Sequence, residues 1–237
     1  MRRRVVILSV VLLAAASLLW VWHVQSSPEL TFHVVTLDPR AVEIRPVVLD
    51  LEATRGLTFS QIVAGMHPYA AINGTFYGGD FRPLGDVMVD GKLVVRGRYP
   101  NAVAVRDDGG VEFVRRSASS FDWRGYRCAL AAGPRLVHNG EVRITASADG
   151  FARLNPKVKA SRSGIGLTHS GRLLLVVCKT PVDMWRFAEL MRDLGAVEAM
   201  NLDGGPACGL YHNGNTLVEA QLRMTNLLVA YRRHAAK

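Results

Sequence analysis

The sequence predicts an α+β fold: a mixed, largely antiparallel sheet domain with few helices, preceded by one N-terminal transmembrane helix. Three features support this. An uncharged apolar run opens the chain, and segments rich in β-branched residues alternate with Asp-Gly and Asn-Gly pairs through the first two thirds. One well-marked helix followed by a strand occupies the last third. The 237 residues, 49% of them hydrophobic and 21% charged, are enough to bury one core.

The start of the chain has the pattern of a membrane anchor. Three arginines at positions 2–4 precede an uncharged run from Val5 to Trp22, which as a helix would span roughly 27 Å, close to the thickness of a bilayer core. Arginines favour the cytoplasmic side, and the two tryptophans that end the run suit the opposite interface. We expect residues 1–24 to anchor the protein, 25–29 to form a connector, and 30–237 to lie outside the cytoplasm, periplasmic or extracellular. Cleavage as a signal peptide, which would secrete the domain, is the alternative.

Strand and hairpin signals dominate the next 120 residues. A short helix is expected at 57–66, because its apolar residues recur at helical spacing. Asp-Gly and Asn-Gly pairs favour the left-handed conformations that tight hairpin turns need. The expected strands are 31–37, 42–49 and 69–73, followed by three hairpins that pair 87–90 with 92–96, 102–106 with 111–114, and 135–138 with 141–144.

The last third alternates strand, helix and strand. Strands are expected at 164–168 and 172–178, and then a helix with Thr180 as N-cap, Pro181 at its first position and Asp183 completing a capping pattern. Gly195 supplies the stop. The predicted apolar face of this helix comprises Met184, Phe187, Ala188, Met191 and Leu194. A strand at 197–203 follows, and strands within 209–218 and at 226–232 close the domain.

Composition restricts the choice of ligands. The net charge is +9, and without the three N-terminal arginines the excess is still +6, which favours an anionic substrate or an anionic surface. No basic run interleaved with aromatic residues suggests nucleic-acid binding. Cys128, Cys178 and Cys208 have no metal-ligand spacing, and we assign no metal ligand and no cofactor; carboxylates brought together by folding could still bind a metal, so metal dependence is left open. Export would permit one disulfide among the three cysteines, which the sequence does not assign. The oligomeric state is also left open.

Three segments place polar residues beside glycines at strand ends, where loops expose them and backbone N–H groups can approach a ligand. They are the segments 73–77 (NGTFY), 161–164 (SRSG) and 201–205 (NLDGG). Each alone is a weak signal, because a glycine turn after a strand is common.

Five fragments in order resemble the phosphodiester glycosidase domain family, over about residues 69–231. AINGTFY is similar to an N-A/G-x-F/Y-F segment of that family, and DFRPLGDVMVDGKLV to its following glycine turn and hairpin. LAAGPRLVHNGEV resembles its G-P-x-L-V hairpin, SRSGIGLTHSGRLLLVV its R-[TS]-x-[IV]-G strand pair, and FAELMRDLGAVEAMNLDGGPACGLY its helix followed by L-D-G-G. The resemblance implies hydrolysis of a glycosidic bond to phosphate.

The residue chemistry agrees with that implied reaction. Arg162 has the planar, permanently charged fork that suits phosphate oxygens, unless it serves a structural salt bridge. Asp203 would stabilise the anomeric carbon, attack it or activate water, unless it only caps its turn. Asn73 would bind a sugar hydroxyl or a phosphate oxygen, unless its amide only fixes the loop. We predict these three as the catalytic residues.

Further residues are predicted to bind substrate. They are Gly74, Thr75, Ser163, Gly204, Gly205 and Asp86. Ordinary glycosidases use a second carboxyl group as acid, and Asp86 and Asp80, which flank a turn near Asn73, are the candidates; both are also typical solvated loop residues. A phosphate leaving group is a weak base, so Arg162 could replace much of that function by neutralising charge.

One departure from the family pattern keeps two alternatives open. Members often carry Ser or Thr after Asp-Gly-Gly, whereas Pro206, Ala207 and Cys208 follow here. The altered turn favours a non-catalytic envelope domain that binds a sugar-phosphate polymer or a protein partner, and fold resemblance alone does not establish activity. Cys208 also allows a thiol nucleophile, but neither His169 nor His212 has a spacing that marks it as a partner.

Overall fold

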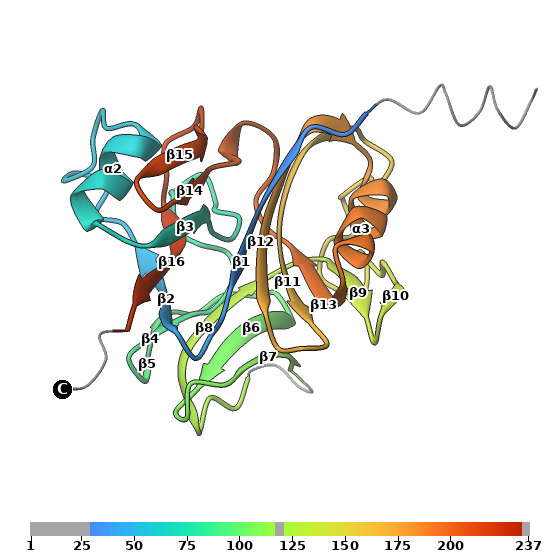
Figure 1. Ribbon diagram of the computed structural model, residues 1–237, viewed down its shortest axis with the longest axis horizontal. Coiled ribbons are helices and arrows are strands. Elements are labelled where there is room, and N and C mark those ends of the chain that lie inside the picture. Colours follow the sequence, from blue (N-terminus) through green and yellow to red (C-terminus); the bar gives the residue numbers. More distant parts are fainter. Residues whose placement is uncertain (1–28, 117–120, 234–237) are drawn as a thin grey trace, which may run out of the picture. The chain divides into compact units, whose positions relative to one another are not determined.

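Antiparallel pairing organises the structure, a computed structural model that describes residues 29–116 and 121–233 (Figure 1). Its strands form three sheets, and all of the strand pairs found in the described residues are antiparallel. Residues from Phe32 onward belong to one compact unit. The expected α+β fold with largely antiparallel sheets is therefore confirmed. The predicted transmembrane helix lies outside the described residues, and none of the helices within them is both long and apolar enough to cross a membrane.

A six-stranded sheet supports 161–164 and 201–205, two of the three segments that place polar residues beside glycines. The strand order is β1 (Phe32–Leu37), β12 (Leu173–Val182), β11 (Ala160–Thr168), β13 (Ala196–Asn201), β9 (Arg135–His138) and β10 (Glu141–Val142). The central strands β12, β11 and β13 come from the strand–helix–strand region of the last third. Helix α3 (Met184–Asp193) contacts β9, β10, β11, β12 and β13 (Figure 1).

A five-stranded sheet supports the third of these segments, 73–77. Helix α2 (Phe59–Met66) packs on it through Phe59, Ile62 and Val63 against Leu227 and other buried residues. Thr58 caps that helix and forms a capping box with Gln61. The strand order is β15 (Asn215–Val218), β14 (Leu210–His212), β3 (Ala70–Asn73), β16 (Asn226–Arg232) and β2 (Val42–Val48).

The third sheet contains the predicted hairpins at Asp90-Gly91 and Asp107–Gly110. Its order is β5 (Lys92–Val95), β4 (Val87–Val89), β8 (Tyr126–Ala132), β6 (Asn101–Arg106) and β7 (Val111–Arg115). The sequence did not predict β8, the central strand. Its segment YRCALAA is dominated by small residues without the β-branched pattern, and its place between β4 and β6 is what makes it a strand.

The three sheets share one hydrophobic core. Buried side chains from each of them belong to the same cluster, including Val35 and Ile165 from the first sheet, Ile72 and Leu228 from the second, and Leu130 from the third. Each is at most 3% exposed. The loops that leave β3 and β13 are thereby held above a rigid support.

The predicted start of the long helix is wrong by about one turn. Strand β12 continues through Pro181 to Val182, which pairs with Ala160, and Asp183 is the actual N-cap, accepting a hydrogen bond from the Arg186 N–H. Pairing with β11 keeps this part of the chain extended, so Thr180 does not cap the helix. The predicted apolar face is otherwise correct at Met184, Phe187, Ala188 and Met191, which are buried, and Leu190 is buried as well.

Candidate active site

A pocket of about 380 Å³ lies beyond the end of β13 and contains two of the three predicted catalytic residues. We call it the large pocket, to distinguish it from a small cavity of about 10 Å³ beside it. Arg162 comes from β11, and Asp203 from the loop after β13. Gly204 and Gly205, which were predicted to bind substrate, line the same pocket. Its other lining residues include Phe76, Arg153, Met184 and Asn201. The pocket therefore joins two of the three segments in which polar residues stand beside glycines, and Phe76 brings in the third.

Arg162 presents a buried guanidinium to this pocket. Its residue is 6% exposed, and none of the described carboxylates lies within ion-pair distance of it. The Nε donates to the Val182 carbonyl oxygen at 3.1 Å, and Nη2 donates to the carbonyl of Val158. Burial lowers the pKa of Arg162, and the more distant Asp183 offsets part of that effect. Two backbone carbonyls thus fix the fork, and its other N–H groups are available to an anion.

The surroundings of Asp203 disfavour the ionised form of its carboxyl group. Burial raises its pKa from 3.8 to about 6, while a hydrogen bond from the Gly204 N–H works in the opposite direction. The Asp203 N–H donates to the Gly74 carbonyl oxygen at 3.1 Å. A carboxyl group with a pKa near neutrality can take up or release a proton during a reaction, which makes Asp203 the strongest candidate for the chemistry.

Asn73 does not line the large pocket. Its side chain is 1% exposed, and its Oδ1 accepts hydrogen bonds from the Ser163 hydroxyl at 2.7 Å and from the Gly209 N–H at 3.2 Å. Its Nδ2 donates to the Asp203 carbonyl oxygen at 2.6 Å. The geometry therefore favours the alternative that the amide fixes the loop, and the expected meeting of all three catalytic residues in one open pocket is wrong for Asn73.

Gly74 and Thr75 are held in place by Asn226, a residue that was not predicted from the sequence. Asn226, at the start of β16, accepts from the Thr75 N–H at 2.7 Å and donates to the Thr75 carbonyl oxygen at 3.0 Å. A Cβ on Gly74 would stand 1.9 Å from the Asn226 Oδ1, so only glycine fits there. These residues border a small cavity of about 10 Å³, also lined by Asp203, and not the large pocket. No sequence pattern marks a partner 151 residues away.

The remaining predicted residues lie outside the pocket. Ser163 is fully buried and donates to Asn73. Asp86 is 2% exposed, and its two oxygens accept from the Gly97 N–H at 2.6 Å and the Trp123 Nε1 at 3.2 Å. Asp80 is exposed and accepts from the Arg82 N–H. Neither aspartate lines the large pocket, so the structure does not place a second carboxylate beside Asp203.

Asn201 belongs to the predicted segment 201–205 but was assigned no role from the sequence. It is the last residue of β13, 1% exposed, and it lines the large pocket. Its Nδ2 donates to the Leu202 carbonyl oxygen, but its buried Oδ1 has no hydrogen-bond partner among the described residues. A buried acceptor without a partner is costly, so packing among the described residues does not account for this oxygen. Its position two residues before Asp203 is the signal that could have identified it.

Aromatic side chains support one wall of the pocket. Phe76 lies 5.4 Å, between ring centroids, from Phe151, which stacks on Tyr99 at 4.4 Å. Phe76 also meets Tyr99 edge-on at 6.0 Å. The three rings pack beside the third sheet and give the pocket a rigid apolar side.

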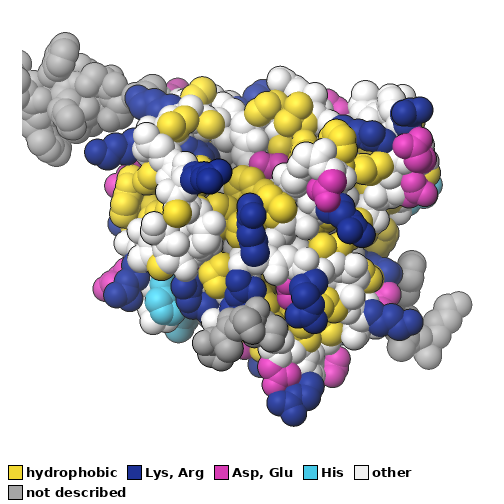
Figure 2. All heavy atoms as spheres, turned by 180° about the vertical axis from the view of Figure 1, so that it is seen from behind, with side chains coloured by type: hydrophobic (Ala, Val, Ile, Leu, Met, Phe, Trp, Pro, Cys, Tyr) yellow, Lys and Arg dark blue, Asp and Glu magenta, His cyan; other side chains and the backbone are white. Residues whose placement is uncertain are grey.

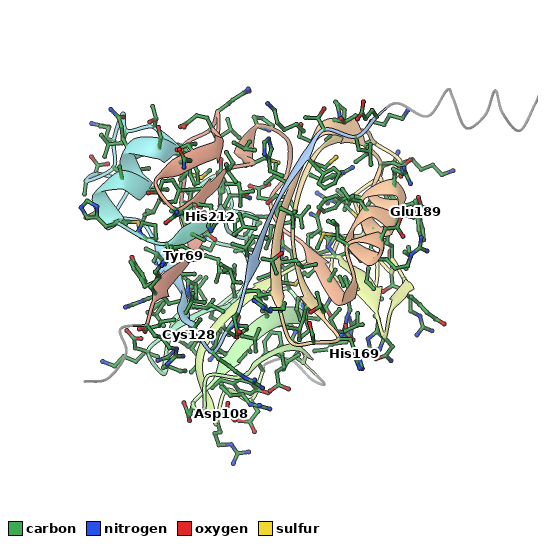
Figure 3. All side chains as sticks on the ribbon, in the orientation of Figure 1. Tyr69, Asp108, Cys128, His169, Glu189 and His212 are labelled. Atoms are coloured by element: carbon green, nitrogen blue, oxygen red, sulfur yellow. The ribbon has the colours of Figure 1, made fainter. Side chains whose placement is uncertain are left out.

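The cysteines are free and buried, and no disulfide joins them. Burial raises the pKa of Cys208 to about 12, so its thiol holds its proton at neutral pH. Of the two candidate partners, His169 lies in the exposed turn after β11, and His212 packs edge-on against Tyr69 at 4.8 Å (Figure 3). The geometry therefore gives no support to thiol catalysis.

The surface carries many basic side chains. Figure 2 shows Lys and Arg side chains distributed over one face, with hydrophobic surface between them. Within the part of the chain that the structure describes, no group of three or more His, Cys, Asp or Glu residues is placed to hold a metal ion.

Comparison with known proteins finds a match to one protein family. The sequence model of the phosphodiester glycosidase family matches residues 66–231. No curated protein matches the chain.

Two solved structures are similar in fold. A Synechocystis protein has a TM-score of 0.74 and 19% identity, with 86% of this chain and 59% of that chain covered. The catalytic domain of zebrafish N-acetylglucosamine-1-phosphodiester α-N-acetylglucosaminidase, auto-inhibited by its pro-peptide, has a TM-score of 0.68 and 18% identity, with 88% and 85% covered.

Proposed function

Because the chain belongs to the phosphodiester glycosidase family, we propose that it hydrolyses the glycosidic bond of a sugar-1-phosphodiester, releasing the sugar and a phosphomonoester. One observation carries this proposal. The unpaired guanidinium of Arg162 and the carboxyl group of Asp203, whose pKa is raised, line the same pocket of about 380 Å³. A pocket of this size suits a sugar with an attached phosphate.

Arg162 serves the phosphate. When the bond between the anomeric carbon and the phosphate oxygen breaks, the electron pair stays on that oxygen and the phosphate gains negative charge. A guanidinium already fixed by the carbonyls of Val158 and Val182 stabilises this charge without rearrangement. The leaving group then needs little protonation, which agrees with the absence of a second carboxylate among the residues that line the pocket.

Asp203 serves the sugar. As a carboxylate it either attacks the anomeric carbon or takes a proton from the attacking water, and in both cases its ionised form is the active one. Asn201 lines the pocket beside Asp203, and Phe76 provides an apolar surface for the ring face of the sugar.

We place the reaction outside the cytoplasm. The support is the uncharged run from Val5 to Trp22 behind three arginines, which has the length and flanks of a membrane anchor. The substrate is then an envelope or extracellular glycoconjugate that contains a sugar-phosphate bond.

The test is turnover of a panel of α- and β-linked sugar 1-(methyl phosphates) by the full-length protein in neutral detergent. We expect hydrolysis of at least one member and no hydrolysis of the matching p-nitrophenyl glycosides, which lack the phosphate. Asp203→Asn and Arg162→Lys should each lose at least about 100-fold in turnover, as expected for loss of one electrostatic stabiliser. Thermal unfolding of each variant would establish that it is folded.

The alternative is a binding domain that uses the same pocket. The turn after Asp203, a short 3₁₀ helix at Gly205–Ala207, contributes no hydroxyl group, which is the observation that favours it. Binding of a sugar 1-(methyl phosphate) that is lost in Arg162→Lys, with no hydrolysis by the unmodified protein, would establish this alternative in place of the hydrolase.

A further inference from the structure

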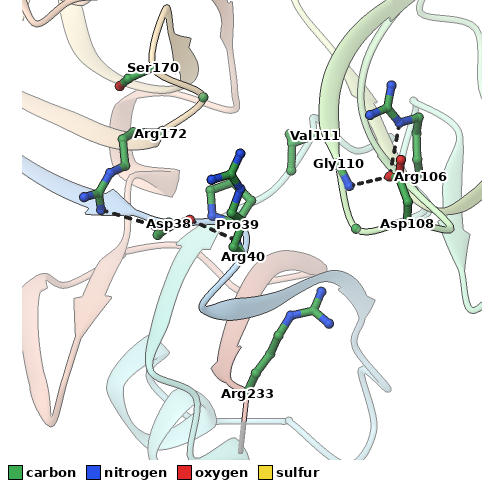
Figure 4. A pocket seen from close by; sticks show the side chains of 12 residues that line it. Asp38, Pro39, Arg40, Arg106, Asp108, Gly110, Val111, Ser170, Arg172 and Arg233 are labelled. Carbon is green, nitrogen blue, oxygen red and sulfur yellow. Dashed lines mark hydrogen bonds and ion pairs between the residues drawn. The ribbon is translucent and has the colours of Figure 1, made fainter. Parts of the chain in front are cut away.

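A second pocket of about 580 Å³ lies away from the candidate active site and shares none of its lining residues. It forms where the β1–β2, β6–β7 and β11–β12 turns meet the residue after β16 (Figure 4). Strand β11 separates the two sites, with Arg162 near its start and Thr168, two residues before the lining residue Ser170, at its end. Six residues of strand correspond to roughly 20 Å.

Four arginines surround this second pocket, each from a different segment. Arg40 follows β1, Arg106 ends β6, Arg172 precedes β12, and Arg233 follows β16. Figure 4 shows their side chains around the pocket together with two aspartates, Asp38 and Asp108. With four guanidinium groups and two carboxylates, its formal charge is +2.

The carboxylates neutralise only part of this arginine cluster. Asp108 accepts from the Arg106 Nε at 3.2 Å and from the Gly110 N–H at 2.8 Å. Asp38 approaches Arg172 at 4.0 Å, and Glu112, which does not line the pocket, approaches Arg106 at the same distance. No ion pair with a described residue involves Arg40 or Arg233, and the Arg40 guanidinium has no hydrogen bond to a described residue either. Two full positive charges, on Arg40 and Arg233, therefore face a common cavity without a carboxylate partner among residues 29–116 and 121–233.

One backbone contact and two glycines shape the part of the pocket around Arg233 and Arg106. The Arg233 Nε donates to the Val42 carbonyl oxygen at 3.0 Å, which directs the end of its guanidinium over the β6–β7 turn. A Cβ on Gly109 would lie 3.0 Å from the Arg233 Nη2, and one on Gly110 would lie 2.4 Å from the Arg106 Nη2. Because Gly109 and Gly110 have no side chain, both guanidinium groups can lie against the turn.

We propose that this pocket binds an anion that carries two or more phosphate charges. Guanidinium forks match phosphate oxygens in pairs, and four of them around 580 Å³ exceed what a single small ion needs. The charge of +2 fits a ligand of at least two negative charges. A soluble phosphate polymer and a dense array of anionic lipid headgroups share this chemistry. The inference does not depend on the proposed hydrolysis.

The test uses inorganic tripolyphosphate and calorimetric titration of the full-length protein in neutral detergent. The pocket variant is Arg40→Gln/Arg233→Gln. The control is Arg55→Gln/Arg192→Gln, which removes the same charge from exposed arginines outside the pocket. We expect the pocket variant to bind at least about 10-fold more weakly and the control to match the unmodified protein, because only the pocket variant loses charge-assisted hydrogen bonds to the anion. Arg40→Glu alone, at an exposed position, should also weaken binding.

Two further binding measurements identify the class of ligand. Citrate should bind more weakly than tripolyphosphate, because its carboxylates carry less charge in a small volume. Detergent micelles doped with phosphatidylglycerol should displace tripolyphosphate if the ligand is a lipid surface, and should leave it bound if the ligand is a soluble polymer. Hydrolysis of sugar 1-(methyl phosphates) should be unchanged in the pocket variant, so failure of the hydrolase proposal would leave this test intact. Equal affinity of pocket variant and control, equal binding of citrate, or no binding of tripolyphosphate at about 1 mM would overturn the proposal.

Discussion

Asn73 supports Asp203 from the end of β3, donating from its Nδ2 to the Asp203 carbonyl oxygen at 2.6 Å. The same amide accepts from Ser163 on β11 and from Gly209 before β14. One buried side chain therefore ties two sheets to the loop that bears the candidate catalytic carboxyl group. Its effect on the reaction is through the position of Asp203, and not through contact with the substrate.

Replacing Asn73 by Ala should destabilise the fold and abolish activity. The change leaves the Ser163 hydroxyl, the Gly209 N–H and the Asp203 carbonyl without partners in a buried site, at a cost of about 2–4 kcal/mol in the free energy of unfolding. Thermal unfolding measures this, with Asn215→Ala, on an exposed residue, as the control.

Asn73→Asp distinguishes positioning from simple structural support. An aspartate keeps the acceptor for Ser163 and Gly209 but places a second carboxyl group beside Asp203. We expect the pH dependence of kcat/KM to move upward by about one unit in the folded variant. An unchanged pH profile together with reduced activity would mean that Asn73 affects only folding.

Gly74 is expected to tolerate no side chain. Because a Cβ there would stand 1.9 Å from the Asn226 Oδ1, Gly74→Ala must push Asn226 away from Thr75 and lose both of their mutual hydrogen bonds. We expect a loss of about 1–3 kcal/mol in unfolding free energy and of most activity. Gly79→Ala is the matched control, since nothing lies within 4 Å of its Cβ position. Equal unfolding temperatures for the two variants would contradict this account.

Local turn chemistry is the part of the fold that the sequence predicts well. Asp90 and Gly91 have φ of 48° and 76°, and Asn139 and Gly140 have φ of 52° and 78°, as the tight hairpins that their residue types predicted require. The central strand β8 was missed because its pairing on both sides, and not its own composition, makes it a strand. Thr180 was misassigned for the same reason, since β11 holds that segment extended.

The candidate site was predictable only where residue type and local sequence indicate chemistry. Arg162 and Asp203 were identified because they lie in segments that resemble the family and because a guanidinium and a carboxyl group suit the implied reaction. Asn226 was not, because its role arises from contacts with Gly74 and with Thr75, which lies 151 residues earlier in the chain. Asp86 was proposed as a substrate carboxylate, yet Gly97 and Trp123 occupy both of its oxygens. Distant contacts of this kind leave no trace in local sequence.

Cys208→Ser should retain activity. The thiol is 4% exposed, and a pKa of about 12 keeps it protonated at neutral pH, so it is not a nucleophile. A buried hydroxyl should cost about 1–3 kcal/mol of stability, but kcat/KM should stay within about threefold. Cys178→Ser, equally buried on β12, is the control and should behave alike. Near-complete loss of activity in folded Cys208→Ser alone would revive thiol catalysis.

The raised pKa of Asp203 predicts that activity and stability respond to pH in opposite directions. If the ionised carboxylate is the active form, kcat/KM rises with pH through about 6 and levels off above it. A fall in kcat/KM through the same range would show instead that Asp203 donates a proton. Asp203→Asn, if it retains measurable activity, should lose this inflection.

Stability should follow the opposite course. The carboxyl group ionises near pH 4 in the unfolded chain and near pH 6 in the folded one, so between these values the folded protein holds a proton that the unfolded chain has released. The free energy of unfolding therefore falls as pH rises from about 4 to 6 and then levels off. Asp203→Asn cannot ionise, so its unfolding free energy should exceed that of the unmodified protein by up to about 3 kcal/mol at pH 7.5 and match it near pH 4. Thermal unfolding at both pH values measures this, with exposed Asp80→Asn as the control. Lower stability of Asp203→Asn at pH 7.5 would mean that hydrogen bonds to the carboxylate outweigh its burial, and that the site is built to hold the charge rather than to resist it.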